Sequence, residues 1–278
     1  MQLSGQVRRS LSGEGNEFKA KEQGGVKMNQ NIGTEEAIKR WDSFADTYSA
    51  NHTEQGDLHK EVFLNPTLLS LMETVRNKNV LDAGCGEGYL SRMLARSEAT
   101  VSAVDYSSRM IEIAKERTPN DLLIDYRQGN CEDLNCLEDK RFDLIISNMV
   151  IQDLANYEKA FQEMYRLLVD GGCFIFSILH PCFVTPESGW EKTKGGKKLH
   201  WNVDKYFYEG VYEQRLGDKE KMLFFHRTLT SYINTLIKTG FILESIIEPK
   251  PSKEMLEKYP SFEEDFRCAD FIVFKLKK

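Results

Sequence analysis

The sequence lacks three features that would each point to a particular class of protein. No two of its six cysteines are separated by two residues, so the usual spacing of zinc sites and thioredoxin-like motifs is missing. No apolar run approaches the roughly 18 residues of a membrane-spanning helix, and the amino terminus has no apolar core of a secretory signal. We therefore expect reduced thiols, a cytoplasmic protein, no bound metal and no membrane partner.

An excess of positive charge is also missing. The chain has 37 Lys and Arg residues against 43 Asp and Glu residues, which gives a formal net charge of -6. This balance provides no general attraction to nucleic acid phosphates. It favours a small-molecule partner and no nucleic acid.

Aliphatic periodicity is absent from residues 1–27, which are rich in Gly, Ser, Gln, Lys and Glu. Such a segment cannot bury enough apolar surface to offset the entropy of ordering. We expect a disordered leader or an upstream extension. Residues 28–278 are then long enough for one large α/β domain with insertions.

Strands and helices alternate through the middle of the chain. Apolar residues at helical spacing first predict two helices, at about 35–50 and 66–76. The strands predicted after them are 80–83, 100–104, 122–127, 142–147 and 173–179, and the helices between them are 89–96, 108–117 and 157–168. This alternation indicates a Rossmann-like α/β fold, in which helices cover both faces of a mostly parallel sheet and ligands bind at the carboxyl ends of the strands.

Regularity is lost over residues 181–225, where aromatic, Gly and Lys residues dominate. We expect this segment to form a cap or lid over the site. A helix at 229–238 and strands at 241–247 and 269–276 follow, and the two strands can close the sheet as a hairpin-like pair.

The strongest chemical signal is the glycine-rich segment from Asp82 to Gly88, where the first strand turns into its helix. Glycines allow backbone amides to approach a ligand closely and permit positive φ. The spacing here is GxGxG, whereas a dinucleotide fingerprint requires GxGxxG. The difference points away from a pyrophosphate and toward another nucleoside-bearing cofactor.

A second signal follows the next strand. Asp105 ends that strand about twenty residues past the glycine turn, where a carboxylate can accept hydrogen bonds from both hydroxyl groups of a ribose. Tyr106 can lie against an adenine face, and Met110, one helical turn along, can close the other side.

These segments together resemble the motifs of class I S-adenosylmethionine-dependent methyltransferases. The matching segments are VLDAGCGEGYL, AVDYSSRMIEIA, QGNCEDL, FDLIISNMVIQDL and LLVDGGCFIFSILHP. The chain is similar in particular to the bacterial type 11 group around the quinone-ring C-methyltransferases. The resemblance implies a seven-stranded sheet whose last strand is antiparallel, with S-adenosyl-L-methionine as the cofactor.

The resemblance also implies a set of cofactor-binding residues. Asp82, Gly84 and Gly86 belong to the first motif, and the two glycines would lie beneath the methionine moiety. The other implied contacts are Asp105 at the ribose, Tyr106 and Met110 around adenine, Asn130, Cys131 and Glu132 at the adenine edge, and Asn148 with Met149 near the sulfonium. A helix such as 35–50 covers the cofactor in similar enzymes, so we expect the Tyr48 hydroxyl to reach the methionine carboxylate. The family usually has Asp at the position of Asn130, whose amide keeps only a carbonyl acceptor.

Two histidines are the candidate catalytic residues. His180 follows the fifth strand and can act as a general base, although it can equally be a strand-end histidine bonded to backbone. His226, with Arg227, can bind an anionic acceptor or stabilise the lid. Trp190, Tyr206 and Tyr208 can form the wall of an acceptor pocket or only anchor the lid.

The function predicted from these features is transfer of a methyl group to O, N or C of a small molecule. Positioning alone can supply much of the rate, so the lack of a catalytic triad is no objection. Three alternatives stay open: methylation of RNA or protein, a non-catalytic module that only binds the cofactor, and a nicotinamide dehydrogenase, which the glycine spacing disfavours.

Overall fold

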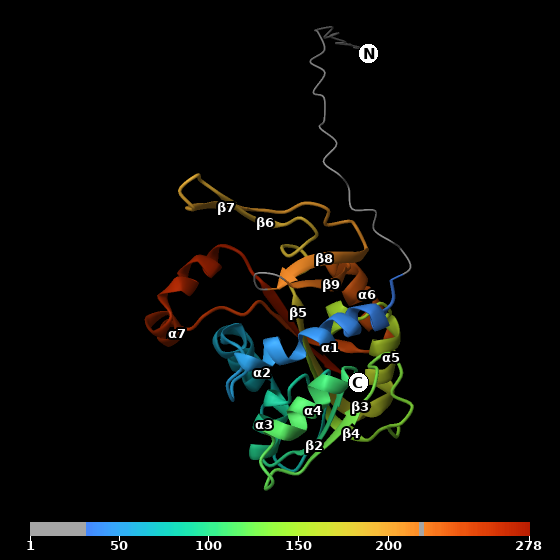
Figure 1. Ribbon diagram of the computed structural model, residues 1–278. Coiled ribbons are helices and arrows are strands. Elements are labelled where there is room, and N and C mark those ends of the chain that lie inside the picture. The colour runs from blue at the N-terminus through green and yellow to red at the C-terminus, as the bar shows by residue number, and fades with distance from the viewer. Residues whose placement is uncertain (1–31, 217–219) are drawn as a thin grey trace, which may run out of the picture.

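A seven-stranded sheet forms the centre of the molecule (Figure 1). The computed structural model describes residues 32–216 and 220–278, so the predicted leader, residues 1–27, lies outside the described residues. The strands in sheet order are β10 (Ile242–Ile247), β11 (Phe271–Lys277), β5 (Leu168–Leu179), β4 (Phe142–Asn148), β1 (Asn79–Ala83), β2 (Thr100–Asp105) and β3 (Ile124–Gln128). Strands β1 to β5 run parallel, whereas β11 is antiparallel to both β5 and β10. This confirms the predicted sheet, its antiparallel last strand included.

Helices cover both faces of the sheet, because the parallel strands are apolar on both sides. The main helices are α1 (Thr34–Ala50), α2 (Asn65–Met72), α3 (Tyr89–Arg96), α4 (Ser108–Arg117), α5 (Tyr157–Leu167) and α6 (Leu229–Thr239). On one face, Phe174 and Phe176 of β5 pack against α5 and α6. On the other face, Ile175 packs in the cluster that holds α2, α3 and α4. The period of two along β5 thus divides the core into two layers.

The predicted cap contains more regular structure than we expected. It holds two antiparallel hairpins, formed by β6 (Gly189–Lys192) with β7 (Lys198–Asn202) and by β8 (Gly210–Leu216) with β9 (Glu220–His226). Consecutive apolar residues from Met222 to Phe225 obscure the strand signal, because β9 buries both of its faces. The polar stretch after β10 also holds regular structure, namely α7 (Lys253–Lys258) and a 3₁₀ helix (Pro260–Arg267).

Helix α1 lies between α4 and the β8–β9 hairpin (Figure 1). Its Asp42 accepts a hydrogen bond of 2.6 Å from the Ser107 hydroxyl at the start of α4. Its Arg40 donates to Glu213 of β8 over 2.8 Å. These contacts place α1 across the carboxyl ends of the strands. In the part of the chain that the structure describes, no helix has both the length and the apolarity needed to cross a membrane.

Candidate active site

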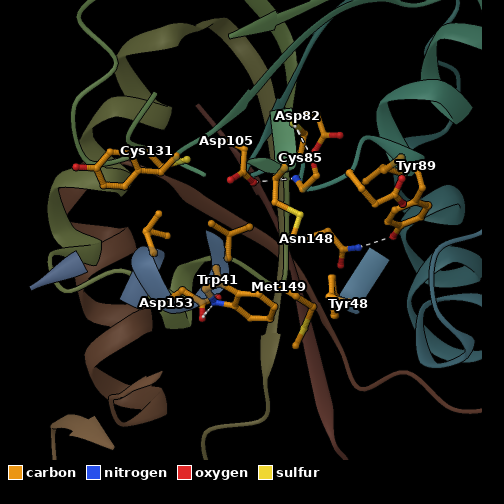
Figure 2. Close-up of a pocket in the computed structure, with 18 of the residues that line it drawn as sticks. Trp41, Tyr48, Asp82, Cys85, Tyr89, Asp105, Cys131, Asn148, Met149 and Asp153 are labelled. Carbon is orange, nitrogen blue, oxygen red and sulfur yellow. Dashed lines mark hydrogen bonds between the residues drawn. The ribbon is translucent and has the colours of Figure 1, made fainter. Parts of the chain in front are cut away.

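The carboxyl ends of β1, β2 and β4 meet at a pocket that α1 covers (Figure 2). Its empty space, with the open mouth included, is about 860 Å³. We call it the first pocket. Ten of the twelve predicted cofactor residues line it: Tyr48, Asp82, Gly84, Gly86, Asp105, Tyr106, Met110, Cys131, Asn148 and Met149.

The glycine turn that follows β1 forms one wall of the first pocket. The φ angles of Gly84, Gly86 and Gly88 are +84°, +53° and +82°, a region that favours glycine. A Cβ atom on Gly84 would lie 2.2 Å from a methyl carbon of Val150, whereas one on Gly86 would meet no atom within 4 Å. Gly84 is thus fixed by packing, and Gly86 leaves open space on the pocket side.

Asp105 anchors the glycine turn. One oxygen of its carboxylate accepts a hydrogen bond of 2.8 Å from the Gly86 amide, and the other accepts one of 2.9 Å from the Ser107 amide. Burial raises the pKa of Asp105, and these backbone hydrogen bonds oppose that shift. Each carboxylate oxygen has two lone pairs, so about two acceptor positions are left for a ligand.

The predicted adenine contacts divide between two places. Tyr106, Met110 and Cys131 line the first pocket. Asn130 and Glu132 instead line a neighbouring groove that Tyr106 shares. The Glu132 carboxylate also accepts hydrogen bonds of 2.6 Å from the Thr34 hydroxyl and the Asn156 amide, so it ties the start of α1 to the start of α5.

Buried polar side chains form the part of the first pocket below β4. Asn148 donates a hydrogen bond of 2.7 Å to the Tyr89 hydroxyl (Figure 2). It accepts one of 2.5 Å from the Ser177 hydroxyl. Asp82 accepts a hydrogen bond of 2.5 Å from the Ser91 hydroxyl, and burial raises its pKa to about 7. Both functional side chains are therefore held in fixed positions before any ligand arrives.

Lys60 is a functional candidate that sequence reasoning missed. Its ammonium group donates to the Tyr48 hydroxyl over 2.6 Å and to the Asp57 carboxylate over 2.7 Å. The side chain is almost fully buried, and although burial opposes the charge, Tyr48 and Asp57 raise its pKa overall. It lies on a π-helical turn (Lys60–Leu64), and such turns often occur at functional sites. A single Lys between His59 and Glu61 gives no periodic signal of burial.

Asp153 was also missed. Its carboxylate accepts a hydrogen bond of 3.0 Å from the Trp41 indole (Figure 2). It accepts another of 3.1 Å from the side-chain amide of Gln152. Burial raises its pKa to about 8. The residue is the last but one of the matched motif FDLIISNMVIQDL, but only the packing of α1 against the 3₁₀ turn Ile151–Asp153 brings Trp41 to it.

A second pocket adjoins the first and shares four of its residues, namely Trp41, Tyr48, Lys60 and Met149. Its remaining lining comes mainly from the cap, the end of β5 and the start of β11. Rings and aliphatic groups predominate in that lining, which includes Leu64, Leu179, Val184, Trp201, Phe224 and Phe271. The arrangement places an apolar chamber beside the Met149 end of the first pocket.

His180 is not among the residues that line either pocket. It is 2% exposed, its Nδ1 accepts the Cys182 amide hydrogen over 3.2 Å, and its Nε2 lies 3.0 Å from a Glu248 carboxylate oxygen. Because Nδ1 acts as an acceptor, Nε2 carries the hydrogen that Glu248 accepts, so no lone pair is left for a substrate proton. Burial lowers its pKa. This arrangement matches the strand-end alternative and gives the predicted base no support.

His226 is likewise placed apart from both pockets. Its Nε2 lies 3.0 Å from the Tyr206 carbonyl oxygen, and burial lowers its pKa. The neighbouring Arg227 donates to the backbone carbonyls of Leu154 and Ala155, so it stabilises the cap rather than facing a ligand.

The aromatic residues predicted to form the acceptor wall have other partners. Trp190 packs edge-to-face on Trp201 with the ring centroids 5.4 Å apart, and Arg267 lies over its ring. The Tyr206 hydroxyl accepts the Leu229 amide hydrogen over 3.2 Å. Trp201, which no sequence signal distinguished from Trp190, lines the second pocket instead.

Comparisons with known proteins point to one family. A family model described as a methyltransferase domain matches residues 81–176. A Haemophilus influenzae protein is 29% identical over 233 residues, which covers 81% of this chain and 89% of the relative. A ubiquinone biosynthesis O-methyltransferase from Coxiella burnetii is 31% identical over 160 residues, and that match covers 55% of this chain and 65% of the relative.

The solved structures give the same result over a longer stretch. A protein from Listeria monocytogenes, whose crystal structure was described as that of an S-adenosylmethionine-dependent methyltransferase, is 33% identical to this chain. The superposition has a TM-score of 0.69 and covers 77% of this chain and 95% of the other. The similarity therefore spans the sheet and its helices and is not confined to the motifs.

Proposed function

This chain belongs to the S-adenosylmethionine-dependent methyltransferases, and we propose that it transfers the methyl group to O, N or C of a small molecule that enters the second pocket. The observation that carries the proposal is Asp105, which anchors the glycine turn and keeps acceptor positions free at the pocket wall. The similarity to a ubiquinone biosynthesis O-methyltransferase favours an oxygen acceptor.

The residues of the first pocket fit S-adenosyl-L-methionine along its length. We propose that the Asp105 carboxylate accepts hydrogen bonds from both ribose hydroxyls. Tyr106, Met110 and Cys131 then lie against the adenine. Gly86 offers the open space that a methionine chain requires. In this proposal Asn130 and Glu132 act from the neighbouring groove, as an outer edge of the adenine site.

At the other end of the pocket, Lys60 and Tyr48 are placed to hold a carboxylate. We propose that the Lys60 ammonium pairs with the methionine carboxylate, because its only charged hydrogen-bond partner in the described chain is Asp57. Asn148, Asp82 and Met149 would then lie toward the amino and sulfonium groups.

When bound, S-adenosyl-L-methionine supplies a methyl group on a positively charged sulfur. The residues of this chain position the two ligands and exclude water from them. Trp41 and Met149 line both pockets, so they lie where the donor and the acceptor meet and shield the point of transfer from water. Asp153 is better placed than His180 or His226 to take a proton, because it lines the first pocket and its pKa is raised by burial to about 8.

Calorimetry with purified protein tests the donor half of the proposal. We expect S-adenosylmethionine and S-adenosylhomocysteine to bind, and NAD⁺ to give no heat. Incubation with metabolite extracts and a donor labelled in its methyl group should then yield labelled small molecules. Binding of NAD⁺ without binding of either sulfur ligand would contradict the proposal. Labelled transfer RNA or labelled protein as the only product would favour the RNA or protein alternative.

The preference of the first pocket for S-adenosylmethionine over S-adenosylhomocysteine is expected to rise with pH. Burial raises the pKa of Asp82 to about 7 and that of Asp153 to about 8, so both are largely neutral at pH 6 and ionised at pH 9. Ionised carboxylates attract the sulfonium charge, which S-adenosylhomocysteine lacks. The ratio of the two dissociation constants should shift about three- to tenfold toward S-adenosylmethionine across this range.

Measuring both ligands at each pH cancels the effects that they share. Asp153→Asn keeps a hydrogen-bond acceptor for the Trp41 indole. In this variant, the ratio of the two dissociation constants should no longer change between pH 7 and 9. A ratio that does not change with pH in the wild-type protein would show that neither carboxyl group senses the donor charge.

A further inference from the structure

The second pocket has its own chemical character, which restricts what can bind there. Four residues line both pockets, so the end of the second pocket at Trp41 and Met149 faces the point of transfer. Asp270, at the start of β11, lines the second pocket but not the first. The pocket therefore has a transfer end, and we call the part of its wall that the first pocket does not share its distal end, which includes the Asp270 carboxylate.

We propose that the second pocket binds the methyl acceptor as a flat, apolar molecule with one basic amine, and that Asp270 holds this amine at the distal end. The proposal rests on the function proposed above, because it takes the second pocket as the acceptor site.

The charges that line the second pocket favour a cation. Its ionisable side chains besides Tyr48 are Asp57, His59, Lys60 and Asp270. The carboxylate of Asp57 lies 2.7 Å from the ammonium of Lys60, so this acid already has a cationic partner in the protein. In the described part of the chain, the Asp270 carboxylate forms no hydrogen bond or ion pair, so its negative charge is the one left over. The Asp270 carboxylate would therefore repel a carboxylate group on the methyl acceptor.

The surroundings of Asp270 strengthen this preference. Burial, and next the nearby Asp265, raise its pKa, against smaller opposing effects of His59 and Lys198. A half-buried carboxylate with an acidic neighbour is stabilised by a cation that displaces its water. The backbone carbonyl of Asp270 accepts the His180 amide hydrogen over 2.8 Å, so the residue is held at the pocket wall.

The apolar walls favour a flat molecule. Trp201 comes from β7, and its indole donates to the Phe183 carbonyl over 2.9 Å, which fixes the ring. Phe224 comes from β9, and Trp41 from α1 lies on the side shared with the first pocket. Aromatic rings around a narrow chamber stack on planar ligands and also attract a cation near their faces.

Two probes with the same ring and opposite charge test the proposal, namely tryptamine and indole-3-acetate. Saturating S-adenosylhomocysteine fills the first pocket, and calorimetry at pH 7.5 gives each dissociation constant. We expect tryptamine to bind at least about tenfold more tightly than indole-3-acetate. Asp270→Asn should reduce this preference to about twofold or less, and Gln214→Trp, which fills the second pocket from β8, should weaken both probes.

Asp121→Asn is the matched control, because Asp121 is exposed and lines neither pocket. It should keep the wild-type preference, and all three variants should bind S-adenosylhomocysteine as the wild type does. Equal or tighter binding of indole-3-acetate, a preference that survives Asp270→Asn, or no binding of either probe would overturn the inference. Failure of S-adenosylhomocysteine itself to bind would instead contradict the proposed function, and the two probes can then be compared without it.

Discussion

Replacement of Asp105 by Ala is expected to weaken the binding of S-adenosylhomocysteine by about 100- to 1,000-fold. The Asp105 carboxylate accepts hydrogen bonds from the amides of Gly86 and Ser107. In our proposal, its remaining acceptor positions bind the two ribose hydroxyls. The substitution removes both ligand contacts and also the anchor of the glycine turn, so the two losses add.

Calorimetry of three variants separates these losses. Asp105→Asn keeps one carbonyl acceptor and should bind with intermediate affinity. Asp125→Asn, an exposed acid on the adjacent strand β3 that pairs with Arg127, should bind as the wild type does. Binding by Asp105→Ala within about threefold of the wild type would contradict the assignment.

A ligand analogue tests the ribose contact directly. The 2′-deoxy form of S-adenosylhomocysteine should bind the wild type about tenfold more weakly than the parent compound. The two compounds should bind Asp105→Ala equally tightly, because the contact with the 2′-hydroxyl is already missing in that variant. An equal loss in both proteins would mean that Asp105 acts only through the glycine turn.

The first pocket could be predicted from the sequence because its signals are local. The glycine spacing before Tyr89 and the acid at the end of β2 each depend on a few adjacent residues, and parallel strands bring their carboxyl ends to one edge. Ten of the twelve residues predicted to bind the cofactor line this pocket. Their contacts with the cofactor stay a prediction.

The second pocket could not be predicted, because its residues come together only in the tertiary fold. Lys60 becomes buried where the π-helical turn packs beneath Tyr48, and no period in the sequence marks that position. Asp270 and Trp201 lie about seventy residues apart in regions predicted as loop or strand edge. For His180 the sequence suggests a role that the tertiary structure does not support. Its place after β5 suggests a catalytic residue, but its Nε2 is engaged by Glu248 of the loop after β10.

Replacement of Arg92 by Leu is expected to lower the free energy of unfolding by about 3–5 kcal/mol. Arg92 is 1% exposed, and its guanidinium donates to the Glu87 carbonyl over 2.7 Å and to the Glu87 carboxylate over 2.8 Å. Without it, Glu87, which precedes Gly88 in the glycine turn, keeps the longer contacts with His52 and Arg117 as its remaining ion pairs among the described residues. The melting temperature should fall by roughly 10 °C for a domain of this size.

The effect should depend on pH in a defined direction. Burial opposes the charge on Glu87, but the hydrogen bonds from His52 and Arg92 lower its pKa to about 2, from the ordinary value of 4.5. A lowered pKa adds stability that is complete above about pH 4.5 and is lost as the pH falls toward 2. The difference between wild type and Arg92→Leu should therefore be largest near pH 7 and should narrow below pH 4.5.

Two further variants decide whether the buried charge is the cause. Arg96→Leu removes a neighbouring arginine on α3 that is 44% exposed and pairs with Glu54, so it should change stability by about 1 kcal/mol or less. The double variant Arg92→Leu with Glu87→Gln should be more stable than Arg92→Leu alone, because no uncompensated carboxylate is left buried. Chemical unfolding followed by circular dichroism measures all three. Equal losses for Arg92→Leu and Arg96→Leu would show that the buried pair adds no more than a surface one, and that packing alone holds the glycine turn in place.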